Sequence, residues 1–255
     1  MTTAPSPEDL WLRNFRPAPD AAVRLACFPH AGGSASFYFP MAGALSPDVD
    51  VFAVQYPGRQ DRRSEPVVTD IGVLADEVAD RLAARADGRP LALFGHSMGS
   101  LVAFEVADRL QDRGTPVSAL IVSGRRAPHL YRGDDIRLRT DDGVVAELRE
   151  LSGTDSGLLG DEEVIRMILP AVRADYQAVE TYLRTTPARL TCPVLALVGD
   201  SDPRVEPDDV RAWADHTTAG FGLKILPGGH FYLLREQAAV LAAVRERLRT
   251  LPVAG

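Results

Sequence analysis

The chain has 255 residues, of which 45% are hydrophobic and 25% are charged. This length and composition fit one large domain or two small ones with a sizeable hydrophobic core, and they exclude a disordered or fibrous chain. The net charge of -7, from 28 basic and 35 acidic residues, argues against a protein built to coat nucleic acid.

The N-terminal residues and the two cysteines bear on the compartment. Residues 1–20 contain acidic residues and prolines but no continuous apolar stretch of a signal peptide, and no later stretch approaches the roughly 18 apolar residues of a membrane span. Cys27 and Cys192 lie in an apolar run or beside a proline, which is more typical of buried thiols than of a disulfide or metal ligands. We therefore expect a cytoplasmic protein that binds neither membranes nor nucleic acid.

Six short apolar runs predict buried strands. In chain order they comprise residues 23–28, 49–56, 91–94, 119–124, 193–199 and 222–229. Continuous apolar runs of this kind are typical of strands that are buried on both faces of a sheet.

Amphipathic segments lie between the predicted strands. Apolar side chains have helical spacing, for example, at Ile71, Leu74, Val78 and Leu82, and again at Leu241, Val244, Leu248 and Leu251 in the last helix. This alternation predicts an α/β fold with a mostly parallel central sheet and helices on both faces. Because the crossovers are right-handed, the carboxyl ends of the strands lie along one edge, where open α/β sheets bind their ligands.

Residues from about 125 to 187 interrupt the alternation. Segments 142–151 and 161–183 have helical patterns, and no convincing strand lies in this region. Within a single domain spanning residues 1–255, we expect a helical insertion that overhangs the active edge as a lid or pocket wall. Substitutions in it, such as Leu169→Ala, should shift substrate preference.

The stretch PLALFGHSMGSLVAFEVADRL, residues 90–110, places a serine between two glycines where a strand ends and a helix begins. Gly95-His96-Ser97-Met98-Gly99 is a G-x-S-x-G sequence in the strand and helix context of a nucleophile elbow. Side chains at positions 95 and 99 would collide with the neighbouring strand and helix, so glycines there let Ser97 protrude above the sheet. The helix start presents N–H groups and its positive dipole end to an anion formed on the attacked carbonyl.

A serine nucleophile needs a histidine base and an acid that orients it, in the chain order serine, acid, histidine. Asp200 and Asp202 follow strand 193–199, and His230 follows the next strand in a glycine-bounded loop. None of the other histidines follows the acid at the end of a strand. We assign His230 as the base and Asp202 as the acid, because the residue next to a strand more often turns inward to fix the loop; Asp200 is the alternative.

An acyl-transfer site also needs two donors for the oxyanion, one of them from the loop after an earlier strand. The loop in CFPHAGGSASFYF, residues 27–39, has small residues at Ala31, Gly32 and Gly33 that let the backbone approach a reacting carbonyl. We assign the oxyanion hole to the backbone N–H groups of Ala31 and Met98.

Several segments together resemble the type II thioesterases, the discrete editing hydrolases of polyketide and nonribosomal peptide assembly lines, which have an α/β-hydrolase fold. These segments are FPHAGG, VQYPGR, FGHSMGSLVAFEVA, LPAVRADYQAVETY, GDSDP and PGGHFYLL. The resemblance extends from about Trp11 to the final helix, and FPHAGG with YPGR is more discriminating than the serine motif. It implies that Ser97, Asp202 and His230 are the catalytic triad, that the oxyanion hole lies around residues 31 and 98, and that the insertion is a flexible helical lid.

The resemblance also implies a substrate and a role in antibiotic biosynthesis. Such enzymes hydrolyse short or aberrant acyl groups from the phosphopantetheine thiol of acyl or peptidyl carrier proteins, through an acyl-enzyme and without a cofactor or metal. The sequence has no nucleotide-binding glycine fingerprint and no His/Cys ligand spacing. We expect a monomer. The alternatives are a carboxylesterase or peptidase of the same fold acting on a free small molecule, and a catalytically inactive module that binds a carrier protein.

Arginines follow two of the predicted strands and suggest a docking site. Arg59, Arg62 and Arg63 follow the strand at 49–56, and Arg125 and Arg126 follow the strand at 119–124. Planar guanidinium donors suit both a phosphopantetheine phosphate and an acidic carrier helix. We expect these arginines to form a cluster at the active edge that binds the carrier protein; the alternative is that they are ordinary charged residues of two solvated loops.

Overall fold

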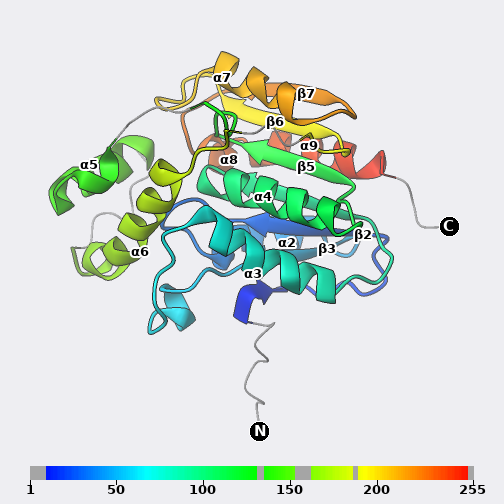
Figure 1. The fold of residues 1–255 in the computed structure, drawn as a ribbon, viewed down its shortest axis with the longest axis horizontal. Coiled ribbons are helices and arrows are strands. Elements are labelled where there is room, and N and C mark those ends of the chain that lie inside the picture. Colours follow the sequence, from blue (N-terminus) through cyan, green and yellow to red (C-terminus); the bar gives the residue numbers. More distant parts are fainter. Residues whose placement is uncertain (1–9, 131–134, 153–161, 186–188, 252–255) are drawn as a thin grey trace, which may run out of the picture.

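The computed structural model describes residues 10–130, 135–152, 162–185 and 189–251. Its core is a seven-stranded sheet in the order β1-β3-β2-β4-β5-β6-β7, in which β1 is antiparallel to β3 and the other neighbouring pairs are parallel (Figure 1). The strands are β1 Leu12–Arg13, β2 Val23–Phe28, β3 Val49–Val54, β4 Leu91–His96, β5 Ala119–Ser123, β6 Val194–Gly199 and β7 Phe221–Leu226. This architecture confirms the predicted α/β-hydrolase fold.

Helices cover both faces of the sheet (Figure 1). A separate hydrophobic cluster lies under each layer of helices. Leu93 of β4 packs in the cluster under α3 and α4, whereas its neighbour Phe94 packs in the cluster under α2 and α9, and both side chains are fully buried. The side chains of adjacent residues in this strand therefore pack on opposite faces of the sheet, as its continuous apolar sequence predicts. The helices of these layers and of the C-terminal half are α2 Phe39–Leu45, α3 Ile71–Ala84, α4 Met98–Asp112, α7 Pro207–Arg211, α8 Tyr232–Arg235 and α9 Gln237–Arg249.

Three details differ from the sequence-based expectations. β1 was not predicted, because a two-residue strand carries no detectable alternation. β7 is not buried on both faces: its residues are half-buried, and Ile225 is exposed, because β7 is the last strand of the sheet. Leu251 lies beyond the end of α9, although its side chain remains buried in the cluster that this helix covers.

The helical insertion lies between β5 and β6, and its helices stand to one side of the sheet (Figure 1). It contains η3 Ile136–Leu138, α5 Asp141–Ser152 and α6 Glu162–Thr181, so both predicted helical patterns are confirmed. These elements share a small hydrophobic core of their own, which includes Leu169. Residues 131–134, 153–161 and 186–188 of the predicted insertion lie outside the described residues.

The strand order creates a crevice at the centre of the sheet. β2 lies between β3 and β4, so the chain leaves β2 toward one side and the chain after β4 continues toward the other. Loops that diverge in this way leave an opening at the carboxyl ends of the strands, which is where α/β sheets bind ligands. In the described part of the chain, no helix is both long and apolar enough to cross a membrane.

Candidate active site

Ser97 occupies the turn between β4 and α4. Its backbone is in a strained conformation, with φ 53° and ψ -118°, which holds the side chain out of the turn. A Cβ at Gly95 would lie 2.2 Å from the carbonyl oxygen of Gly99, and a Cβ at Gly99 would lie 2.0 Å from the carbonyl oxygen of Phe28. The two glycines are therefore required by backbone contacts on either side of the serine, as the sequence predicts.

The structure brings His230 and Asp202 into direct contact. His230 Nδ1 lies 2.8 Å from Asp202 Oδ2, and both side chains are buried. Asp202 Oδ1 also accepts a hydrogen bond from the backbone N–H of Arg204 at 2.9 Å. Asp200, which directly follows β6, instead accepts the Gly228 N–H at 3.0 Å and so fixes the loop that carries the histidine. It is therefore Asp202, and not Asp200, that orients the His230 ring in this structure.

The loop after β2 presents three successive N–H groups near the serine. The Gly33 N–H donates to the His30 carbonyl at 2.9 Å, and the Gly32 N–H donates to Asp175 Oδ2 at 2.7 Å. These bonds leave the Ala31 N–H as the donor of this loop that can face a substrate. Met98 is the first residue of α4, so its N–H has no acceptor within the helix. The N–H groups of Ala31 and Met98 therefore remain the candidate oxyanion donors.

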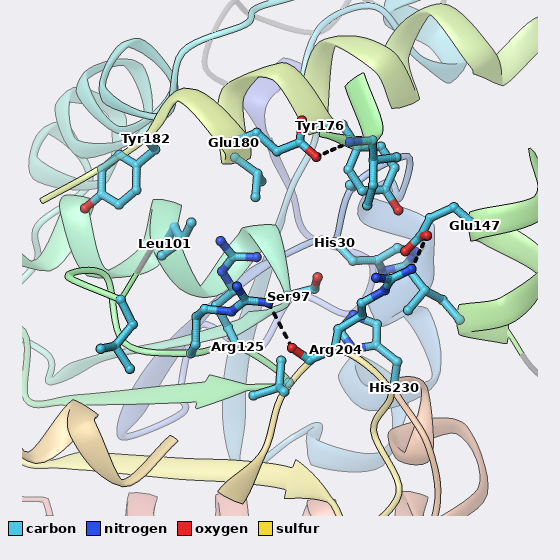
Figure 2. Close-up of a pocket in the computed structure, with 18 of the residues that line it drawn as sticks. His30, Ser97, Leu101, Arg125, Glu147, Tyr176, Glu180, Tyr182, Arg204 and His230 are labelled. Atoms are coloured by element: carbon cyan, nitrogen blue, oxygen red, sulfur yellow. Dashed lines mark hydrogen bonds and ion pairs between the residues drawn. The ribbon is translucent and has the colours of Figure 1, made fainter. Parts of the chain in front are cut away.

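Ser97 and His230 line one pocket together with residues of the insertion (Figure 2). Ala31 belongs to the same lining, and Leu101 of α4 lies beside the serine in the close-up. The insertion supplies the opposite wall, from Ile136, Glu147, Leu148, Leu151, Tyr176, Val179 and Glu180. Leu169 packs in the insertion's own core and is not among the side chains that line this pocket. The effect of Leu169→Ala on substrate preference stays a prediction, and the lining side chains are closer to a bound substrate.

Two further histidines surround His230. The ring centroids of His96 and His230 are 5.1 Å apart, and those of His30 and His96 are 5.9 Å apart. Burial, together with the nearby His230 and Arg59, lowers the pKa of His30 to about 3. Burial and the other two histidines hold the pKa of His96 well below its ordinary value. Both rings are therefore neutral near pH 7, so they add no positive charge beside His230.

Each helix of the insertion contacts a loop that follows a strand of the sheet through a buried carboxylate. Glu147 of α5 forms an ion pair with Arg204, which lies two residues after Asp202 (Figure 2). Burial raises the pKa of Glu147. Asp175 of α6 forms an ion pair with Arg59 in the loop after β3. Buried carboxylates are costly unless paired, so these contacts fix where the insertion sits on the sheet.

The predicted arginine cluster is largely absent from the surface. Arg59 is buried against Asp175, and Arg62 is buried between Glu65 and the ring of Trp11. Arg126 is also buried, and its guanidinium donates to the Arg204 carbonyl at 2.9 Å. The expectation that these three arginines bind a carrier protein is wrong, because folding pairs them within the chain. Arg63 is exposed, and Arg125 lines the pocket.

The part of the chain that the structure describes contains neither a metal-binding cluster nor a reactive cysteine. No group of three or more His, Cys, Asp or Glu side chains among those residues could hold a metal ion. Cys27 and Cys192 are both free and buried. Burial raises the pKa of Cys192 to about 11, and it raises that of Cys27 further, so both are unreactive thiols near neutral pH.

The fold and this set of groups define an α/β-hydrolase with a serine nucleophile. A family model described as "Thioesterase domain" matches residues 23–248. Thioesterase PikA5 of Streptomyces venezuelae is 49% identical over 236 residues, which cover 91% of this chain and 84% of the relative.

Solved structures agree with the sequence comparison. The type II thioesterase BorB of the borrelidin biosynthetic cluster is 49% identical, with a TM-score of 0.90 over 97% of this chain and 100% of that chain. The thioesterase RedJ of the prodiginine pathway in Streptomyces coelicolor is 38% identical, with a TM-score of 0.84 over 97% of this chain and 91% of that one. The chain therefore belongs to the thioesterase family, as a type II thioesterase of polyketide and nonribosomal peptide biosynthesis, and the predicted resemblance is confirmed.

Sequence reasoning missed the paired charges that connect the insertion to the catalytic loops. Arg59 and Asp175 each stand in a segment that carried the resemblance, YPGR and VRAD, but they are 116 residues apart in the chain. A single sequence gives no sign of such a pairing. Glu147 and Arg204, 57 residues apart, are a second case.

Proposed function

We propose that this type II thioesterase hydrolyses acyl groups from the phosphopantetheine thiol of acyl or peptidyl carrier proteins, with Ser97, His230 and Asp202 as its catalytic triad. The observation that supports the triad most directly is the contact of 2.8 Å between His230 and Asp202, at the pocket that Ser97 also lines. Membership in the family supports the thioester substrate.

The proposed reaction has two acyl-transfer steps. His230 Nε2 accepts the Ser97 hydroxyl proton as Ser97 Oγ attacks the thioester carbonyl, and Asp202 stabilises the resulting imidazolium through Nδ1. The N–H groups of Ala31 and Met98 stabilise the tetrahedral oxyanion. When this intermediate collapses, the carbon–sulfur bond breaks and His230 returns its proton to the departing thiolate. Water then attacks the acyl-enzyme with His230 again as the base, releasing the acid and free Ser97.

The insertion is proposed to act as the lid and acyl-pocket wall of a single domain. Its side chains close the pocket opposite Ser97, and several of them are apolar, including Leu148 and Val179. An apolar wall close to the serine suits an acyl chain, whereas the nearby Arg125 suits the phosphate of the phosphopantetheine arm. Arg63, which is exposed on the loop after β3, is the other basic side chain proposed to meet an acidic carrier protein.

The test compares hydrolysis of one acyl group presented as a carrier-protein thioester, as a small thioester and as an oxygen ester. We expect the carrier thioester to have the highest kcat/KM, and Ser97→Ala to lower thioester turnover by on the order of 10⁴-fold or more while the protein stays folded. A preference for the free oxygen ester would favour a carboxylesterase instead. Carrier binding without turnover would favour an inactive binding module.

A further inference from the structure

Asp175 joins three segments that are distant in the sequence. Its carboxylate accepts hydrogen bonds from Arg59 Nη1 and Nη2, at 2.7 and 2.8 Å, and from the backbone N–H of Gly32 at 2.7 Å. The Asp175 side chain is completely buried, and that of Arg59 is 7% exposed. One carboxylate of the insertion therefore contacts both the loop after β3 and the loop that contains Ala31.

The contact with the Ala31 loop is close as well as polar. Val172, one helical turn before Asp175, packs against the same loop, since a Cβ at Gly32 would lie 2.7 Å from Val172 Cγ2. Gly32 also has a φ of 74°, which favours glycine, so the loop turns at the point where α6 approaches it. Arg59 holds the Gly33–Ser34 peptide of the same loop, because its Nη1 donates to the Gly33 carbonyl at 3.1 Å.

These bonds hold the Ala31–Gly32 and Gly33–Ser34 peptides in the loop that follows β2. A backbone N–H stabilises an oxyanion only when it is aimed at the developing charge, and a free glycine-rich loop has many other conformations available. The Gly32–Asp175 bond is charge-assisted and its acceptor, the Asp175 side chain, is completely buried, so it restricts the loop strongly. An ion pair that served only to anchor the insertion would not need the Gly32 N–H as a third partner.

We propose that Asp175, acting with Arg59, is a positioning residue that orients the loop after β2 so that the Ala31 N–H faces the carbonyl attacked by Ser97. The insertion then contributes to transition-state stabilisation in addition to shaping the pocket. This inference rests on the proposed function, because it takes Ala31 as an oxyanion donor.

The test separates the Gly32 contact from the ion pair. Asp175→Ala removes both, whereas Asp175→Asn loses the charge but keeps an oxygen that can accept the Gly32 N–H. Steady-state hydrolysis of a small thioester gives kcat and KM, and a trifluoromethyl ketone analogue reports on the oxyanion hole through its reversible adduct with Ser97. Asp141→Asn is the matched control, because Asp141 pairs with Arg173 of the same insertion at an exposed site, away from the catalytic loops.

We expect Asp175→Ala to lower kcat roughly 10- to 100-fold, somewhat less than the loss of a whole oxyanion donor, with KM changed by less than about threefold. Inhibitor affinity should fall by the same factor. Asp175→Asn should recover kcat to within roughly fivefold of wild type although its Tm falls, because a buried Arg59 then lacks its anion. The control should match wild type. Equal losses of kcat in the alanine and asparagine variants, or a loss of kcat without weaker inhibitor binding, would overturn the inference.

If Asp175→Ala does not fold, the double variant Arg59→Met/Asp175→Leu replaces it, because apolar residues often substitute for a buried ion pair without loss of stability. It leaves the Gly32 N–H without its acceptor, so the same loss of kcat and inhibitor affinity is expected, and wild-type values would refute the inference. Thioester hydrolysis by the wild type that is lost in Ser97→Ala tests the proposed function separately. The inhibitor series tests the positioning role whichever ester is preferred.

Discussion

Replacing the two aspartates after β6 by asparagine, one at a time, tests the assignment of the catalytic acid. Asp202 is fully buried, and its two oxygens accept His230 Nδ1 at 2.8 Å and the Arg204 N–H at 2.9 Å. An asparagine there has only one oxygen for these two donors. If its amide N–H₂ faces the ring, Nδ1 must be the unprotonated nitrogen, so the proton moves to Nε2 and His230 cannot accept the proton of Ser97.

The expected loss follows from this change of tautomer. A mis-set histidine lowers kcat by on the order of 10⁴-fold, which corresponds to about 5 kcal/mol of transition-state stabilisation. Asp200→Asn is the matched control, since the new amide oxygen can still accept the Gly228 N–H. Weakening that single hydrogen bond should lower the rate by less than about tenfold.

The assay measures release of free thiol from a small acyl thioester with a colorimetric thiol reagent. Cys27 and Cys192 are both buried in the folded protein, so the reagent reads the product thiol with little background from the enzyme. Circular dichroism shows whether each variant is folded. A folded Asp202→Asn variant that retains activity within tenfold of wild type, or a larger loss in Asp200→Asn, would refute the assignment.

Three further predictions concern stability, the pocket and the carrier protein. Burial lowers the pKa of His30 to about 3 in the folded protein, whereas the ordinary histidine pKa is about 6.5. Below pH 6.5, therefore, His30 binds a proton in the unfolded chain but not in the folded protein, which lowers the free energy of unfolding. When the pH is lowered from 6.5 to 4.5, the free energy of unfolding measured in urea titrations should fall in both proteins, but by about 2 kcal/mol less in His30→Leu than in wild type. Equal decreases in the two proteins would contradict this prediction. Leu148→Ala should shift kcat/KM toward longer acyl chains, whereas Leu169→Ala, in the insertion's own core, should lower the free energy of unfolding by about 2–5 kcal/mol without a comparable shift in the chain-length profile. Arg63→Glu should raise KM for a carrier-bound thioester roughly threefold at low salt and less at high salt, and an equal effect on a small thioester would argue against docking.

The sequence by itself determined the sheet except for β1, the elbow, and the chain order of the candidate catalytic groups, because each of these is encoded locally. The apolar run before Gly95, the two glycines and the helical pattern after Ser97 are contiguous, so their physical requirements can be recognised in a few residues. The parallel topology then brings the ends of separate strands to one edge without further information. His230 and its pair of candidate acids could be placed there for this reason.

Only the tertiary structure shows which of those two aspartates contacts His230. Asp200 and Asp202 are two residues apart and chemically identical, so the choice depends on which one the loop turns toward His230 and which toward Gly228. The position of Asp200 next to the strand favoured Asp202 as the acid, but the direction of each side chain is visible only in the folded loop.

The arginines show the same limit more clearly. In the sequence Arg59 and Arg63 are both basic residues in one loop, but folding buries Arg59 against Asp175 and leaves Arg63 exposed. The pairing joins positions 116 residues apart, and it follows from how α6 packs on the sheet. Burial and ion pairing are properties of packed surfaces, so a residue's type and neighbours in the chain do not determine whether it binds a partner or holds the fold together.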